Sequence, residues 1–442
     1  MQPNNWRGSV SAPAGYGKTH AIVEVVKSIQ DKPALILTHT NAGVHALRER
    51  LQKEGVRQSA FALTTLDAFS QRIVRAFPAR SEYQINPTTA LSYVEIRQAV
   101  LRALAAGALD QILPASFCGV LVDEYQDCDL LQHQLVSAID LLLPVRVYGD
   151  HLQAIFEFGE ELVDWSLVEK AFPPLGRLTK PERWERAGCA KLGEWLHEIR
   201  QALENGQSVN FDGCPKAHVT LKTHTDDQIQ WEQDALSHMR LAKGEKLFII
   251  ENSPAMAVRR DFARRHPGVA MVERSDLPDL QQFCQQVAGA PDDPKKITNL
   301  AIQHAEAVMT SVRGTVLSQR VESLLSGRAR NAPDQAEQAA LSFLSDPSPN
   351  GLIQVLMSLR ARRGTRLFRT ELFEATTQTL SRCQAFSEIQ ASADIIRNRR
   401  RFVPRALYQR SIGSTLLLKG LQSHSAIVLD HGALPTRHLY VA

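Results

Sequence analysis

"SAPAGYGKTHAI", residues 11–22, is the stretch that decides the fold of this chain. It matches the phosphate-binding pattern G-x-x-x-x-G-K-[ST] except at the first position, where Ala12 replaces the glycine. A short apolar run precedes the stretch and a segment with helical spacing follows it, which is the context that such a loop requires. The pattern therefore predicts a strand, a loop whose backbone N–H groups cradle phosphate, and a helix.

The residue types of this loop suit the binding of ATP and Mg²⁺. Glycines permit the backbone dihedrals of the loop, the lysine reaches the β- and γ-phosphates, and the threonine hydroxyl binds the metal ion. The residues that we predict to bind the nucleotide here are Ala14, Gly15, Tyr16, Gly17, Lys18, Thr19 and His20. The alternative interpretation is a chance glycine-rich turn before a helix.

A second apolar run, at 119–122, ends in the acids Asp123 and Glu124. Open α/β sheets bind ligands outside the carboxyl ends of their strands, which is where this pair is expected to lie. We predict that Asp123, with Thr19, holds Mg²⁺ and that Glu124 orients and deprotonates the attacking water. Acids also end strands without any function, but the combination with Lys18 favours the catalytic interpretation.

The composition is typical of a globular protein with two or three domains, since 44% of the 442 residues are hydrophobic and 22% are charged. The net charge of +4 suits a polyanionic partner without requiring one. The six cysteines form no C-x-x-C pair, which argues against structural zinc and a disulfide framework. Without a signal peptide or a long apolar run, we expect a soluble cytoplasmic protein that binds no membrane.

Short apolar runs alternate with helical patterns in the first third of the chain, which predicts an α/β fold with a parallel sheet wrapped by helices. The expected strands of this sheet lie at 8–13, 34–40, 119–125 and 145–150. A second sheet is expected from the runs at 218–224, 246–253 and 424–432. The segment from 276 to 405 is mostly amphipathic and helical.

Together these motifs resemble the superfamily 1A helicases of the UvrD/Rep/PcrA type, over nearly the whole chain. That family writes its second motif as D-E-x-Q-D, and this chain has DEYQD at 123–127. It also writes alanine at the first position of its phosphate loop, as Ala12 does here. The resemblance implies two RecA-like domains that clasp ATP and drive movement along single-stranded or partly duplex DNA, in the 3′ to 5′ direction by analogy.

Three further stretches resemble family motifs in the expected order, namely LTHTNAGVHALRER, TTLDAFSQRI and VYGDHLQAIFEFG. The resemblance implies that Gln153 senses the γ-phosphate. The residues that it places on nucleic acid are His39, Asn41, Thr65, Phe156, Phe158 and Ser414. Stacking of bases on aromatic rings contributes about 1–3 kcal/mol per base, although core packing is the alternative role for the two phenylalanines.

The second half carries motifs that would complete the ATP site. LTKPERW resembles L-x-x-N-Y-R-S, which places Arg183 as the arginine finger, with Arg186 as the substitute. STLLLKGLQ resembles T-x-H-x-x-K-G-L-E, with Gln422 where the family has the glutamate that contacts the ribose. The final HLYVA matches the beginning of L-Y-V-A-x-T-R but not its threonine and second arginine.

The resemblance also implies a division into domains. Residues 1–177 would form the first RecA-like domain, with a short insertion at 78–117. Residues 178–275 and 406–442 would form the second, and 276–405 would form a helical insertion within it.

Two other functions stay open. The chain could be a nucleotide-dependent DNA-binding switch that regulates a partner such as a nuclease, because short UvrD-like proteins also occur beside nucleases in antiphage systems. A P-loop kinase or transporter ATPase explains Lys18 and Asp123 but not the later motifs. The basic run RNRRRFVPR at 397–405 fits either a DNA phosphate contact or a solvated helix face.

Overall fold

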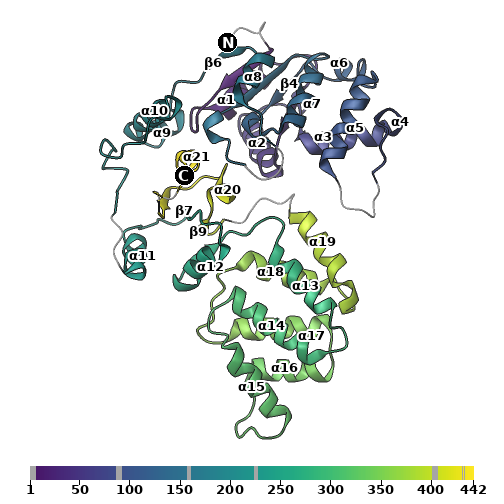
Figure 1. Ribbon diagram of the computed structural model, residues 1–442, viewed down its shortest axis with the longest axis vertical. Coiled ribbons are helices and arrows are strands. Elements are labelled where there is room, and N and C mark those ends of the chain that lie inside the picture. Colours follow the sequence, from purple (N-terminus) through teal and green to yellow (C-terminus); the bar gives the residue numbers. More distant parts are fainter. Residues whose placement is uncertain are drawn as a thin grey trace. The chain divides into compact units, whose positions relative to one another are not determined.

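The computed structural model describes residues 6–85, 92–156, 161–222, 227–400, 407–430, 432 and 434–442. The chain forms two compact units, one of Met1–Thr223 with Pro435–Val441 and the other of His224–Leu434 with Ala442. Each unit contains one parallel β-sheet with helices around it (Figure 1). The α/β fold class expected from the sequence is therefore confirmed.

The first unit is built on a sheet of six parallel strands in the order β3-β2-β4-β5-β1-β6. Its strands are β1 (Gly8–Ser11), β2 (Ala34–Thr38), β3 (Phe61–Thr65), β4 (Gly119–Val122), β5 (Val145–Gly149) and β6 (Pro174–Arg177). The four runs that the sequence analysis assigned to this sheet are confirmed as β1, β2, β4 and β5.

Side chains alternate between the two faces along each strand, and both faces of this sheet are buried. In β2, Leu35 and Leu37 face one hydrophobic core and Ala34 and Ile36 face the other. The helices of this part are α1 (Lys18–Lys27), α2 (Asn41–Lys53), α3 (Leu66–Ala76), α4 (Pro78–Ser81), α5 (Tyr93–Ala105), α6 (Ile112–Ser116), α7 (Leu130–Asp140) and α8 (Trp165–Ala171), with short 3₁₀ turns η1 (Gln58–Ala60), η2 (Tyr125–Asp127) and η3 (His151–Gln153).

Helix starts follow from local side-chain chemistry. The hydroxyls of Thr40 and Thr65 accept hydrogen bonds from the first turns of α2 and α3. Asp129 and Gln132 form a reciprocal capping box at the start of α7. These caps satisfy backbone donors that would otherwise lack partners at the sheet edge.

Residues 178–222 and the end of the chain also belong to the first unit. They form α9 (Glu182–Arg186), α10 (Ala190–Glu204) and α21 (Thr436–Val441), and α21 contacts both α10 and η3. The sequence analysis placed the domain boundary at 177, whereas the compact units divide at 223 because α9 and α10 pack on the phosphate-loop side of the first sheet.

The second unit contains a sheet of four parallel strands in the order β10-β7-β9-β8. The strands are β7 (Leu247–Ile250), β8 (Val269–Met271), β9 (Arg410–Gly413) and β10 (Ser425–Val428), and the flanking helices are α11 (Gln228–Ser237), α12 (Met256–Arg265) and α20 (Thr415–Leu418). The predicted strands at 246–253 and 424–432 are confirmed as β7 and β10. The strand predicted at 218–224 is wrong where it is described, since 219–222 are irregular and mostly exposed and have no strand to pair with.

The remaining helices of the second unit share one large apolar core. They are α13 (Pro278–Ala288), α14 (Pro294–Val308), α15 (Gly314–Leu325), α16 (Gln335–Ser345), α17 (Pro349–Ala361), α18 (Thr370–Ser381) and α19 (Ile389–Arg400), with η4 (Phe386–Glu388) (Figure 1). The helical character predicted for 276–405 is thus confirmed as far as residue 400. Within the described ranges, no helix combines the length and the apolar character that a membrane span needs.

Candidate active site

The candidate site lies at the carboxyl edge of the first sheet. The loop that carries Lys18 follows β1, Asp123 and Glu124 follow β4, and Asp150 follows β5. Because β5 lies between β1 and β4, three adjacent strands deliver these side chains to one edge. This is the edge at which parallel sheets bind ligands.

The loop between β1 and α1 has the backbone shape of an anion cradle. Gly15 and Gly17 have φ angles of 81° and 84°, in the left-handed region that favours glycine. Gly17 precedes the first turn of α1, and its carbonyl accepts a hydrogen bond from Ala21 N at 2.8 Å. Ala12 is fully buried, so its small side chain fits where the pattern has glycine. The free N–H groups at the start of α1 make this loop suitable for phosphate.

Lys18 is the cation at the centre of the site. Its Nζ forms an ion pair with Glu124 Oε2 and lies 3.8 Å from Asp123 Oδ1. Burial lowers the pKa of Lys18, but the two carboxylates outweigh that effect and hold the pKa above its ordinary value. Lys18 therefore carries a positive charge at neutral pH.

The two carboxylates are held in an unfavourable state. Asp123 is only 8% exposed, and its pKa is raised to about 6. Burial is the main cause of the rise, the charge of Lys18 opposes it, and the charge of Glu124 adds to it. Glu124 has φ 55° and ψ 42°, a left-handed conformation that costs a residue with a Cβ about 1–3 kcal/mol. Strain and a raised pKa of this kind are typical of ligand sites rather than of structural ion pairs.

Gln126 and Asp150 connect Glu124 to Gln153. Gln126 Nε2 donates to Glu124 Oε2 at 2.7 Å, and Gln126 Oε1 accepts from the backbone N–H of Asp150 at 2.9 Å. Asp150 Oδ2 accepts from Gln153 Nε2 at 2.7 Å. The sequence motifs alone gave no role to Gln126 or Asp150. Their positions could have indicated a role, because each is a polar residue within four positions of the end of a buried strand.

Arg183 lies against the phosphate loop. Its backbone N–H donates to the carbonyl of Gly15 at 2.9 Å, and its side-chain charge interacts with that of Glu124. Its guanidinium lies 5.8 Å from the ring centre of Trp184, and Trp184 Nε1 would be 2.9 Å from a Cβ built on Gly15. Helix α9 therefore packs on the loop at Gly15, where a side chain would collide. The buried ring of Tyr16 faces His197 of α10, with ring centres 6.2 Å apart.

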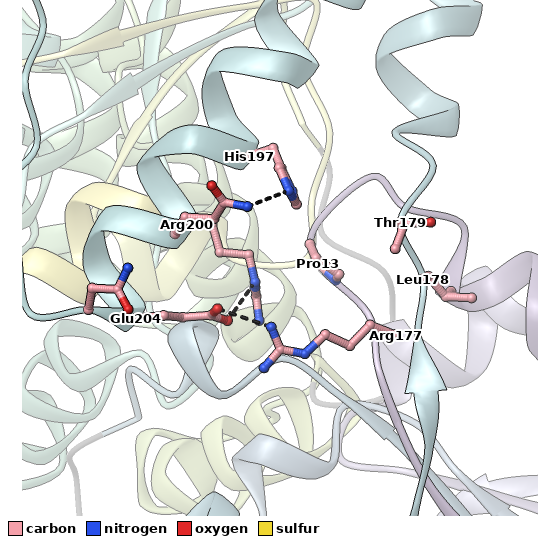
Figure 2. Close-up of a pocket in the computed structure, with 9 residues that line it drawn as sticks. Pro13, Arg177, Leu178, Thr179, His197, Arg200 and Glu204 are labelled. Atoms are coloured by element: carbon pink, nitrogen blue, oxygen red, sulfur yellow. Dashed lines mark hydrogen bonds and ion pairs between the residues drawn. The ribbon is translucent and has the colours of Figure 1, made fainter.

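A cavity of about 280 Å³ lies beside the loop, bounded by Pro13, β6 and α10 (Figure 2). Arg200 and Arg177 enter it from opposite sides and both pair with Glu204, at 3.0 and 3.1 Å. In the described part of the chain, Arg200 Nη2 is buried and has no hydrogen-bond partner.

The residues expected to contact nucleic acid lie at the ends of β2, β3 and β5. His39 Nε2 is 3.4 Å from Cys128 Sγ, Asn41 begins α2, and the hydroxyl of Thr65 is engaged in the cap of α3. Phe156 is partly buried after η3. Phe158 lies outside the described residues.

Ser414 and Gln422 belong to the second unit. The hydroxyl of Ser414 accepts from Leu417 N at 3.4 Å and caps α20, which follows β9 at the carboxyl edge of the second sheet. Gln422 is exposed in the segment between α20 and β10. The backbone of Thr415, next to Ser414, donates to Asn252 Oδ1 at 3.2 Å, which ties the ends of β9 and β7 together.

Comparison with known proteins covers both sequence and fold. No curated protein matches the chain. Among solved structures, the arterivirus nonstructural protein 10, a helicase determined in complex with DNA, aligns with 63% of this chain and 52% of its own, at 14% identity and a TM-score of 0.26. The chain thus covers about half the length of that protein.

One protein-family model, described as an AAA domain, matches residues 4–159. The matched range contains the phosphate loop, the acids after β4 and the turn after β5. Residues 4–159 are therefore similar to an AAA domain.

Proposed function

We propose that this protein is an ATP-dependent translocase or helicase of the UvrD type that moves along single-stranded DNA, 3′ to 5′ by family analogy. The observation that carries the proposal is the meeting of Lys18, Asp123 and Glu124 at the carboxyl edge of the first sheet, with the backbone of Arg183 bonded to the same loop. The AAA domain match over 4–159 supports the nucleotide part of the proposal.

In this proposal the backbone from Ala14 to His20 holds the phosphates of ATP, and Lys18 exchanges Glu124 for the β- and γ-phosphates. The hydroxyl of Thr19 and the carboxylate of Asp123 suit Mg²⁺, which prefers oxygen ligands. A buried carboxylate whose pKa is raised to about 6 fits a cation site, because the cation would compensate the unfavourable charge. Bound Mg²⁺ would neutralise charge on the phosphates.

Hydrolysis would then depend on four side chains. Once Lys18 has turned to the phosphates, Glu124 is released to accept a proton from the attacking water. Gln153 senses the γ-phosphate, and Arg183 stabilises the charge that develops in the transition state.

The DNA strand would cross the carboxyl ends of the other strands. We assign its contacts on the first unit to His39, Asn41, Thr65, Phe156 and Phe158, and on the second unit to Ser414. Gln422 is proposed to contact the ribose of ATP. The two sheets would serve as the two RecA-like lobes, 78–117 as a short insertion in the first and 276–405 as the helical insertion in the second.

The experiment that tests this function is ATP turnover with and without single-stranded DNA, with an RNA strand of the same sequence as a third condition. We expect DNA-stimulated hydrolysis that both Lys18→Ala and Glu124→Gln reduce by at least about 100-fold. Lys53→Ala, at an exposed position on α2, is the matched control and should keep wild-type turnover.

Two results would contradict the motor. ATP binding without turnover in the wild-type chain would instead support a nucleotide-dependent switch that regulates a partner such as a nuclease. Turnover that neither substitution lowers would exclude this site altogether.

A further inference from the structure

The carboxylate of Asp150 is the meeting point of three parts of the first unit. Its Oδ1 accepts from Arg200 Nη1 of α10 at 2.5 Å. Its Oδ2 accepts from the hydroxyl of Tyr440 of α21 at 3.2 Å, in addition to Gln153 Nε2. Leu152 N donates to Oδ1 at 3.3 Å, so four donors saturate this one side chain.

The centre of this network is buried, whereas Gln153 and Tyr440 are partly exposed. Asp150 is 0%, Gln126 is 1% and Arg200 is 3% exposed. Arg200 Nη1 also donates to the hydroxyl of Tyr440 at 3.0 Å, and its guanidinium lies 5.9 Å from the centre of that ring. A buried carboxylate that pairs with a buried arginine and has a full set of donors keeps one geometry.

A continuous hydrogen-bonded path therefore runs from Lys18 through Glu124 and Gln126 to Asp150. From there it divides toward Gln153 on one side and toward the helices α10 and α21 on the other. The motif comparison matched stretches that contain Gln126, Asp150 and Tyr440 but gave no role to these residues or to Arg200.

We propose that Gln126 and Asp150 are positioning residues of the hydrolytic site, which hold Glu124 and Gln153 in register with each other and are anchored by Arg200 and Tyr440. The inference rests on the proposed function, since it concerns the orientation of the groups that would act on ATP. It makes the C-terminal helix α21 a support of the chemistry performed on the first sheet.

The physical reason is the shared carboxylate of Glu124. In the structure its Oε2 takes donors from both Lys18 and Gln126. When Lys18 turns to the phosphates, Gln126 becomes the donor that keeps the carboxylate aimed. Because misplacement of a catalytic group by about 1 Å can cost about 100-fold in rate, loss of that donor should affect turnover more than binding.

The test uses Gln126→Met, which keeps the length of the side chain and removes both hydrogen bonds. With the full chain and single-stranded DNA, we expect kcat for ATP to fall by about 10- to 100-fold while KM for ATP stays within about twofold. Gln52→Met, at an exposed position near the end of α2, is the matched control and should change neither constant.

A second measurement needs no nucleotide. Asp150→Asn removes the charge that Arg200 and the Tyr440 hydroxyl share. We expect the backbone amides of residues 436–441 to exchange hydrogen for deuterium about tenfold faster in this variant than in the wild-type chain. The exchange of α2 residues should stay unchanged.

The failures can be told apart. An active wild-type chain whose Gln126→Met variant keeps its kcat within about twofold would overturn the positioning role and leave the proposed function standing. A rise in KM with kcat unchanged would also overturn it, because the path would then serve nucleotide binding. Unchanged exchange at 436–441 in Asp150→Asn would overturn the anchoring of α21, whatever the wild-type turnover.

Discussion

The two sheets carry charged residues at the same carboxyl edge but hold their carboxylates in different states. In the second unit, Glu251 follows β7 and pairs with Arg259 at 3.3 Å, and both oxygens of Glu273, after β8, accept from Arg369 at 2.6 and 2.7 Å. Arg369 also binds Asp279 of α13 at 2.6 Å. At the edge of the first sheet, two carboxylates converge on the single amine of Lys18.

That difference in the state of the carboxylates separates a structural edge from a ligand site. Arg369 and Glu273 are each 2% exposed, and their pairing joins the second sheet to the helices that follow it. The first sheet keeps a carboxyl group with a raised pKa and a strained Glu124 at this edge. Since the topology is parallel in both units, the fold alone does not decide which edge binds a ligand.

Removing the ion pairs of Arg369 in the second unit should have the largest effect on stability. Arg369→Ala leaves Glu273 buried and unpaired, so we expect the second unit to lose about 3–5 kcal/mol of unfolding free energy, measured by urea denaturation. Arg399→Ala, at an exposed position of α19, should change stability by less than about 0.5 kcal/mol. Equal behaviour of the two variants would show that the Arg369 cluster is not a structural joint.

Neutralising Asp123 at the carboxyl edge of the first sheet should instead increase stability. Without Mg²⁺ at pH 7.5, Asp123→Asn should stabilise the first unit by about 2–3 kcal/mol, because the charged carboxylate is disfavoured in the folded state. The raised pKa means that this penalty is absent below about pH 4 and complete above about pH 6, so the gain in thermal midpoint should vanish in acid. Asp31→Asn, on an exposed carboxylate, is the control. A variant less stable than wild type at pH 7.5 would contradict the unfavourable state of the charged Asp123 carboxylate.

The stability of the second unit should instead decrease in acid. Burial, with Arg369 nearby, lowers the pKa of His304 to about 4, while its Nε2 is 2.9 Å from Thr376 Oγ1. Stability is therefore complete above the ordinary histidine pKa and is lost as the pH falls toward 4. We expect the second unit to lose about 2 kcal/mol of unfolding free energy between pH 7.5 and pH 5. Hydrogen exchange of the α14 amides would measure this loss. His304→Gln should flatten this pH dependence, and a variant with the wild-type slope would exclude His304 as its source.

The smallest effect concerns the contact between α9 and the phosphate loop. Gly15→Ala places a Cβ 2.9 Å from Trp184 Nε1 at a left-handed position, so we expect a destabilisation of about 1–2 kcal/mol in thermal unfolding. Gly55→Ala shares the left-handed backbone but meets no described atom within 4 Å, and should cost about 1 kcal/mol. A cost for Gly15→Ala no greater than that for Gly55→Ala would show that the packing of Trp184 on the loop contributes little.

Much of the fold was accessible from local patterns. Four short, mostly apolar segments at β1, β2, β4 and β5, alternating with helical patterns, predicted a parallel sheet, although β1 and β5 contain the polar residues Ser9, Ser11 and Arg146. β3, β6, β8 and β9 were missed. β6 is mostly exposed, the three central residues of β3 are only partly buried, and β8 has only three residues. Lys18, Asp123 and Glu124 were likewise nameable in advance, since the phosphate loop and the acids after a strand have recognisable local sequences.

The sequence by itself determined the α/β class, the phosphate loop and the residue types around it, because these depend on side-chain periodicity and on chemistry within a few neighbouring residues. The tertiary structure decided that α9, α10 and α21 join the first unit, that Trp184 contacts Gly15, and that Asp150 is held by Arg200 and Tyr440. Those contacts link residues up to 290 positions apart, and no local pattern encodes which distant donor will satisfy a buried carboxylate.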